Sequence, residues 1–173
     1  MPVAPLTRLP SGSDVFLDSN VFVHAFLCRS AECLALLERC AKEEIYGVTS
    51  LHVVVEATHR LMLAEACSAG IIARESARLL KKKPEAVARL SRYWTQAQSI
   101  LDMNILILDT DQSWLHQAQR ERAAYGLLTN DSLIVAAMRE HGLRILASTD
   151  GDFDGVSGLV RYEPSDLPQS TVP

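Results

Sequence analysis

Residues 14–24 read DVFLDSNVFVH, and this stretch decides how the rest of the chain is interpreted. Residues 15–17 have the bulk and branching of a buried β-strand. Asp18 follows at once, residues 19–20 offer turn and cap chemistry, and a second apolar run begins at Val21 as a helix would. The stretch therefore predicts a short buried strand that ends in a carboxylate and passes directly into a helix.

Asp18 allows two interpretations. In an open α/β sheet, ligands bind outside the carboxyl ends of the strands, so a carboxylate placed there can hold a cation or position a water molecule. Alternatively, Asp18 only caps the helix that follows it. Further acidic residues at equivalent places in the chain would favour the first interpretation.

Strands and helices alternate along the chain, which favours a parallel sheet covered by helices on both faces. We therefore expect one α/β domain over residues 1–173, with three α/β/α layers. The run at 105–109 predicts a buried strand, and 159–162 predicts a short edge strand. The principal strands are expected at 14–17, 45–50, 105–109 and 143–147.

Two helices are expected at 68–83 and 86–103, so that residues 65–100 form an inserted helical hairpin. Residues 1–13 and 164–173 contain prolines and are expected to be loose.

The composition sets limits on function. Hydrophobic residues make up 48% of the 173 residues, and the mean hydropathy of +0.07 is slightly apolar for a monomer, so we expect a homodimer. No apolar run is long enough to cross a bilayer and the first residues do not read as a secretory signal, so a cytoplasmic protein without membrane contact is expected. The net charge of −4 disfavours strong nonspecific binding to nucleic acid. It does not exclude a nuclease, because a carboxylate cluster becomes functional once it binds a divalent cation.

Further acidic residues follow strands or open helices. Glu56 lies early in the helix after the second strand, Asp131 opens a later helix, and Asp150 and Asp152 follow the last strong strand. A parallel sheet brings such positions to the same edge. Clustered carboxylates repel one another and need a counter-charge. Oxygen ligands suit Mg²⁺ or Mn²⁺, which activate water and neutralise charge on a phosphodiester.

Each of these residues also has a simpler explanation. Asp131 can be an acid favoured by the dipole at a helix N-terminus, and Glu56 can lie on a solvated helix face. The segment from Asp150 to Asp152 can be only a turn. Asp109 also ends a strand, but its neighbours suit a helix cap, so we place it as a cap first and a site residue second.

Four motifs in this order resemble the PIN domain family, and the match runs from Asp14 to about Tyr162. The chain is similar in particular to the VapC-like toxin ribonucleases of bacterial and archaeal toxin–antitoxin pairs. The motifs are Asp18-Ser19-Asn20 after an apolar strand, Ser50 with Glu56 six residues on, Asp131-x-x-Ile134-x-x-Ala137, and Ser148-x-Asp150-x-Asp152-Phe153.

The resemblance implies an endoribonuclease that cleaves single-stranded or structured RNA with Mg²⁺ or Mn²⁺, and that has a cognate antitoxin protein as partner. It implies that the catalytic, metal-holding residues are Asp18, Glu56, Asp131 and Asp150, with Asp152 as a further ligand. It also implies supporting roles for Asn20, Ser50 and Ser148, through hydrogen bonds to ligands or water.

One segment departs from the family. The chain from about Glu65 to Ser99 is longer than a compact toxin of this family carries there. In one interpretation, the charged residues of the segment simply face solvent on a helical hairpin. In the other, the segment is an arm that binds RNA and supplies the positive charge that the rest of the chain lacks. Its cationic residues are Arg74, Arg78, Lys81, Lys82, Lys83, Arg89 and Arg92.

Two other functions are weighed against the ribonuclease. One is a non-catalytic PIN-like module for RNA binding or assembly, against which the full set of acidic positions counts. The other is a Mg²⁺-dependent phosphatase on a similar sheet. Such enzymes often carry a second Asp two residues after a nucleophilic Asp, and here Asn20 occupies that place.

Overall fold

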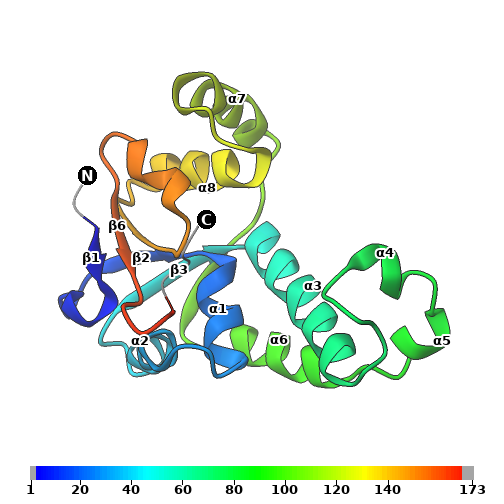
Figure 1. Cartoon of the computed structure of the whole chain (residues 1–173). Coiled ribbons are helices and arrows are strands. Elements are labelled where there is room, and N and C mark those ends of the chain that lie inside the picture. Colours follow the sequence, from blue (N-terminus) through cyan, green and yellow to red (C-terminus); the bar gives the residue numbers. More distant parts are fainter. Residues whose placement is uncertain (1–2, 169–173) are drawn as a thin grey trace.

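Six parallel strands form one sheet in the order β1-β6-β5-β2-β3-β4, and helices flank it in an α/β/α arrangement (Figure 1). The computed structural model describes residues 3–168. This architecture confirms the predicted parallel α/β fold. The strands are β1 Ala4–Pro5, β2 Asp14–Leu17, β3 Tyr46–Ser50, β4 Ile105–Leu108, β5 Ile145–Ala147 and β6 Val160–Glu163.

The helices connect these strands as the alternating pattern requires. Together α1, α2, α3 and α6 pack against one another, while α7 packs on α8. Short 3₁₀ helices lie at η1 Leu6–Arg8 and η2 Gly151–Gly155. The α-helices are α1 Ser19–Phe26, α2 Ala31–Ala41, α3 Leu51–Ser68, α4 Ala77–Leu80, α5 Pro84–Val87, α6 Arg92–Asp102, α7 Ser113–Tyr125 and α8 Thr129–Glu140.

Strand β2 lies in the middle of the sheet, between β5 and β3. Its residues Val15, Phe16 and Leu17 are fully buried, in agreement with the continuous apolar run that predicts a strand covered on both faces. The chain then passes from Leu17 through Asp18 directly into α1. The acidic residue Asp18 therefore lies at the carboxyl end of β2, a central strand of the sheet.

Two strand expectations are wrong in their details. Strand β4 is an edge strand with Leu106 61% exposed, although its four apolar residues predict burial. Strand β6 is not an edge, because β1 pairs with it through Ala4 and Pro5. The apolar pattern of β4 indicates a strand but contains no information on its place in the sheet. Strand β1 has only two residues, which is too short for a periodic pattern, so its pairing with β6 could not be predicted.

The ends of the chain are more ordered than their composition suggests. Residues 3–13 are not loose, because β1 and η1 dock there and Leu6 and Leu9 are buried. Near the other end, Asp166 accepts hydrogen bonds from the Ala31 and Glu32 amides at the start of α2. Asp166 thus connects this end of the described chain to the body, and residues 1–2 and 169–173 lie outside the described part.

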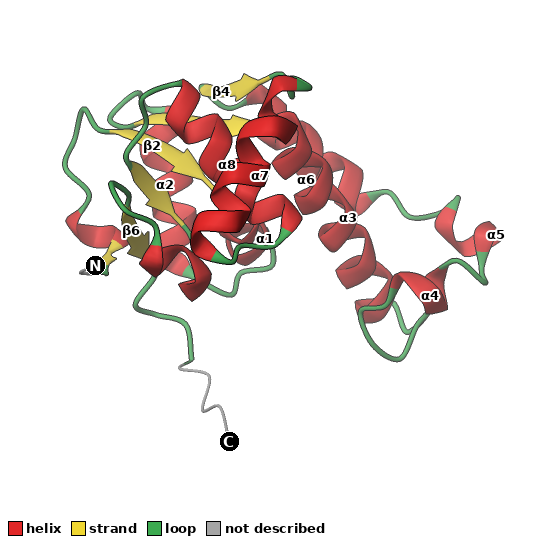
Figure 2. Cartoon of the chain, turned by 90° about the horizontal axis from the view of Figure 1, so that it is seen from above, coloured by secondary structure: helices red, strands yellow, loops and turns green. Residues whose placement is uncertain are grey.

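The segment between α3 and α6 projects from the body as an arm, defined here as residues 69–91 (Figure 2). It is partly helical as expected, but the predicted helices at 68–83 and 86–103 are wrong in extent. Instead α3 runs to Ser68, and the arm holds only the four-residue helices α4 and α5 before α6 begins at Arg92.

Glu65 on α3 fastens the point where the arm returns to the body. Its Oε1 atom accepts hydrogen bonds from the Ser91 and Arg92 amides at 3.1 and 3.2 Å, and its Oε2 atom accepts one from Tyr93 at 2.7 Å. Partial burial acts to raise the pKa of Glu65, but the three amides outweigh it and lower the pKa. One carboxylate thus satisfies the free N–H groups at the start of α6.

Within residues 3–168, no single helix combines the length and the apolar character that a bilayer crossing requires. Helices α1 and α2 meet both criteria only when taken together, and their axes are bent by 108°.

Glu65→Gln should lower the free energy of unfolding at pH 7 by about 1 kcal/mol, because a neutral amide accepts these bonds less strongly. The lowered pKa means that the contribution of Glu65 is complete above the ordinary pKa of a glutamate. It is lost as pH falls through the lowered value, so variant and wild type should converge in acid. Urea unfolding across pH measures this, with exposed Glu38→Gln as the control. Equal stability of E65Q and wild type at pH 7 would contradict the assignment.

Candidate active site

A cleft of about 490 Å³ opens at the carboxyl end of β2. The starts of α1 and α8, the first half of α3 and the turn after β5 form its walls. Four of the acidic residues singled out from the sequence line it together: Asp18, Glu56, Asp131 and Asp150. The sheet therefore brings together carboxylates that are far apart in the sequence, whereas Asp109 is not among the residues that line the cleft.

Asp18 is the most buried of these carboxylates, with 6% of its surface exposed. Its Oδ1 atom accepts a hydrogen bond from the Ser19 amide, and its Oδ2 atom accepts from Ser148 Oγ at 2.7 Å and from Asn20 Nδ2. Burial raises the pKa of Asp18, the hydrogen bonds from Ser148 and Ser19 act against this, and the nearby charge of Glu56 raises the pKa further. Asp18 thus caps α1 and also faces the cleft.

Asn20 and Ser148 join the two central strand ends. The Asn20 side chain donates to Ser148 Oγ at 3.1 Å and accepts from the Thr149 amide at 3.1 Å. Ser148 Oγ also accepts from the Asp150 amide at 3.0 Å. Both residues therefore lie in contact with the carboxylates, which is the geometry that their expected supporting roles require.

Glu56 is held on the α3 wall by two donors. Its Oε1 atom accepts from Ser19 Oγ at 3.0 Å, and its Oε2 atom accepts from Asn130 Nδ2 at 3.1 Å. Arg60, one turn further along α3, donates to Ser19 Oγ at 3.2 Å and also lines the cleft. The sequence analysis assigned no role to Asn130 or to Arg60. The four-residue spacing places Arg60 on the same face of α3 as Glu56, and this was the available signal.

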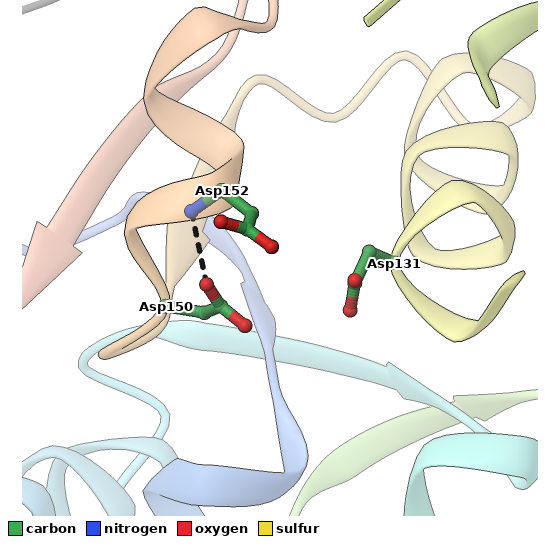
Figure 3. A group of neighbouring side chains, drawn as sticks. All are labelled: Asp131, Asp150 and Asp152. Atoms are coloured by element: carbon green, nitrogen blue, oxygen red, sulfur yellow. Dashed lines mark hydrogen bonds between the residues drawn. The ribbon is translucent and has the colours of Figure 1, made fainter. Parts of the chain in front are cut away.

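Asp131, Asp150 and Asp152 form a close acidic group, shown in Figure 3. Each offers an oxygen atom within 4.8 Å of the others, and the Asp152 amide donates to Asp150 Oδ1 at 2.9 Å. Burial, followed by the charges of the neighbouring acids, raises the pKa of Asp131 to about 6. The three side chains offer only oxygen ligands, and their negative charges repel one another. Such a set fits a hard divalent cation such as Mg²⁺ or Mn²⁺.

Other residues expected at the site lie elsewhere. The buried Ser50 Oγ is 3.0 Å from His52 Nδ1, and Ser50 does not line the cleft. Lys81, Lys82, Lys83 and Arg89 are on the arm, and Arg92 begins α6. Their roles stay predictions.

Arg161 on β6 supports the turn that carries Asp150 and Asp152. It is 7% exposed, it makes a two-pronged contact with Asp154 on η2 at 2.6 and 3.0 Å, and it donates to the Ser148 carbonyl at 3.0 Å. Glu163 accepts a further bond at 2.6 Å. The guanidinium thus ties both ends of the acidic turn to the sheet.

A sequence model of the PIN domain family matches residues 15–159. The chain belongs to the PIN domain family. No curated protein matched this PIN domain.

Among solved structures, this PIN domain resembles VapBC2 from Rickettsia felis bound to promoter DNA, at 16% identity and a TM-score of 0.57, over 87% of this chain and 98% of that one. DNA-bound VapBC from Salmonella typhimurium matches at 15% identity and a TM-score of 0.56, over 87% and 97%. The sarcin–ricin-loop-cleaving toxin VapC20 from Mycobacterium tuberculosis matches at 16% identity and a TM-score of 0.55, over 83% and 95%. At these identities the likeness shows a shared fold.

Asp131→Asn should stabilise the metal-free protein above pH 6. The pKa of about 6 in the folded state exceeds the ordinary value of 3.8, so the native state binds the extra proton between these values. Wild-type stability should therefore fall as pH rises from 4 to 6. Because Asp131 is partly exposed, we expect a gain on the order of 1 kcal/mol for D131N, absent near pH 4. Thermal unfolding in EDTA measures it, with Asp109→Asn as control. A gain that does not depend on pH would contradict the electrostatic cause.

Arg161→Lys should loosen the acidic turn. Lysine cannot make the two-pronged contact or hold Asp154, Ser148 and Glu163 together. We expect Mn²⁺ affinity to fall about tenfold by calorimetry, as for other residues that orient metal ligands. Only protein that is folded by circular dichroism is compared. Folded R161K that binds Mn²⁺ as wild type would limit Arg161 to a structural role.

Proposed function

We propose that this PIN domain is a metal-dependent endoribonuclease and the toxin of a toxin–antitoxin pair. The observation that carries the proposal is the cleft itself, in which Asp18, Glu56, Asp131 and Asp150 converge with Asp152 close by. The four carboxylates that line the cleft and the neighbouring Asp152 repel one another, and this is an arrangement that a cation stabilises. Membership of the PIN domain family supports a nuclease.

Asp131, Asp150 and Asp152 would hold the cation, and Asp18 and Glu56 would complete the acidic wall. A bound Mg²⁺ or Mn²⁺ supplies charge neutralisation for the phosphodiester and lowers the pKa of a coordinated water. The donors around Asp18 and Glu56 fix both carboxylates in one orientation. A fixed geometry of this kind lowers the reorganisation that the reaction requires.

Arg60 adds positive charge to the cleft. Among the described residues that line it, Arg60 is the cationic one, and its side chain lies beside Ser19 and Glu56. A guanidinium at this position suits a non-bridging phosphate oxygen of the substrate. The cleft thus combines acidic side chains that suit a cation with one group that suits the RNA backbone.

RNA as substrate and an antitoxin as partner are supported by the structures that share the fold. Two of these are VapBC toxin–antitoxin complexes, and a third is a toxin that cleaves the sarcin–ricin loop. We extend these properties to this chain as part of the proposal, together with a homodimer and a cytoplasmic location. The phosphatase alternative is weakened further, because Asn20 is bonded to Asp18 where a second Asp would be needed.

Asp150→Asn and Asp18→Asn should each reduce metal-dependent RNA cleavage by about 100-fold or more, since each removes a charge aimed at the cation or the phosphodiester. The measurement uses purified protein with Mg²⁺, Mn²⁺ or EDTA on single-stranded RNA, tRNA and DNA. D109N is the matched control and should cleave as wild type.

Loss of cleavage in both variants with folding retained supports the proposal. Cleavage by D150N at the wild-type rate would refute it. A wild-type protein that neither cleaves RNA nor binds Mn²⁺ would instead favour the non-catalytic module.

A further inference from the structure

Charge is strongly segregated along this chain. The arm holds six of the 17 Lys and Arg residues but only two of the 21 Asp and Glu residues. It therefore carries a formal charge of +4, while the remaining residues carry −8 and give −4 overall. A polyanion that approaches the acidic body would be repelled unless it met the arm.

The positive charge of the arm is not neutralised from within. All six of its cationic side chains are exposed. Within residues 3–168, five of them make no ion pair and no side-chain hydrogen bond, while Lys83 donates to the Ile71 carbonyl. The five are Arg74, Arg78, Lys81, Lys82 and Arg89.

The arm is packed against the body. A small apolar cluster joins Leu63 and Ala66 of α3 to Ile72 and Leu80 of the arm. Glu75 of the arm forms a 3.0 Å ion pair with Arg29, which follows α1. The cations are therefore held on a fixed support, and binding through them loses less conformational entropy than binding through a loose tail.

A second hollow, of about 480 Å³, lies between the body and the base of the arm. Arg29 and Arg92 line it, together with Ala64 and Ser68 of α3. Ala64 and Ser68 continue the face of α3 that carries Glu56 and Arg60 in the acidic cleft, because these four residues lie four positions apart along the helix.

Helix α1 also extends from the cleft to the hollow. Ser19 and Asn20 at its start line the cleft, and Phe26 at its end lines the hollow. Figure 1 shows α3 running from the sheet towards the arm, with α1 and α6 beside it. The distance along α3 from Glu56 to Ser68 is about 18 Å at 1.5 Å per residue. Helices α1 and α3 thus lead from the acidic cleft, which Arg60 lines, to the hollow that Arg29 and Arg92 line beside the arm.

We infer that the cleft, the hollow and the arm together form an extended RNA-binding track, in which the arm binds backbone phosphates of an RNA whose scissile bond lies in the cleft. The inference rests on the proposed function for the identity of the ligand. Exposed, unpaired Lys and Arg side chains suit phosphates, and such contacts position a nucleic acid without reading its sequence. The arm therefore favours RNAs long enough to reach from the cleft to α4 and α5 over short ones.

The test measures binding separately from cleavage, in full-length protein that carries Asp150→Asn to prevent cutting. Lys81→Ala/Lys82→Ala removes two cations from the arm. The matched control, Lys42→Ala/Arg120→Ala, removes two exposed cations that line neither the cleft nor the hollow. Fluorescence anisotropy follows a labelled short and a labelled long single-stranded RNA across a salt series in Mg²⁺.

The arm variant should bind the long RNA about tenfold more weakly than its parent, and the control should stay within about twofold. The slope of log affinity against log salt should become shallower by about 1.4, since each phosphate contact contributes about 0.7. Affinity for the short RNA should not change.

Equal long-RNA affinity of the arm variant and its parent would overturn the inference, and so would equal losses in arm and control variants. The binding result does not depend on catalysis. A wild-type protein that never cleaves RNA would refute the proposed function, and an arm-dependent long-RNA affinity would still stand.

Discussion

Repulsion among buried and half-buried carboxylates is the constraint on which the rest of this structure depends. Burial and neighbouring charge raise the pKa values of Asp18 and Asp131 because the cleft gathers negative charge where water is partly excluded. A protein tolerates this only if donors and a rigid frame hold the groups in place. The donors are short polar side chains at the ends of the two central strands, Asn20 and Ser148.

The outer parts of the sheet strengthen this frame. Arg161 reaches from β6 to the turn after β5, so the acidic turn depends on a strand two positions away from β2. Strand β1 protects the other side of β6, which would otherwise be an exposed edge. Asp166 caps α2, and Glu65 caps α6, so carboxylates also serve at two helix starts where backbone N–H groups lack partners.

The sequence predicted the central strand and the acidic site better than it predicted the arm and the contacts between distant elements. The apolar run at 15–17 and the acid that follows it indicated a central strand, and the acids after the second and last strong strands indicated one convergent site. The arm was harder, because Gly70 and Pro84 interrupt a composition that otherwise favours long helices. The contacts of Asn130 with Glu56 and of Arg161 with Ser148 depend on strand order and helix packing. Local patterns contain no information on either.

The bond between Ser148 and Asp18 joins residues 130 positions apart. During synthesis, the ribosome therefore releases β2, α1 and Glu56 long before their partners exist. The acidic wall remains incomplete until β5 and the Asp150 turn emerge and insert beside β2. A topology of such long-range pairings folds late and slowly. If the cleft is the nuclease site proposed above, its topology delays activity until nearly the whole polypeptide has been translated.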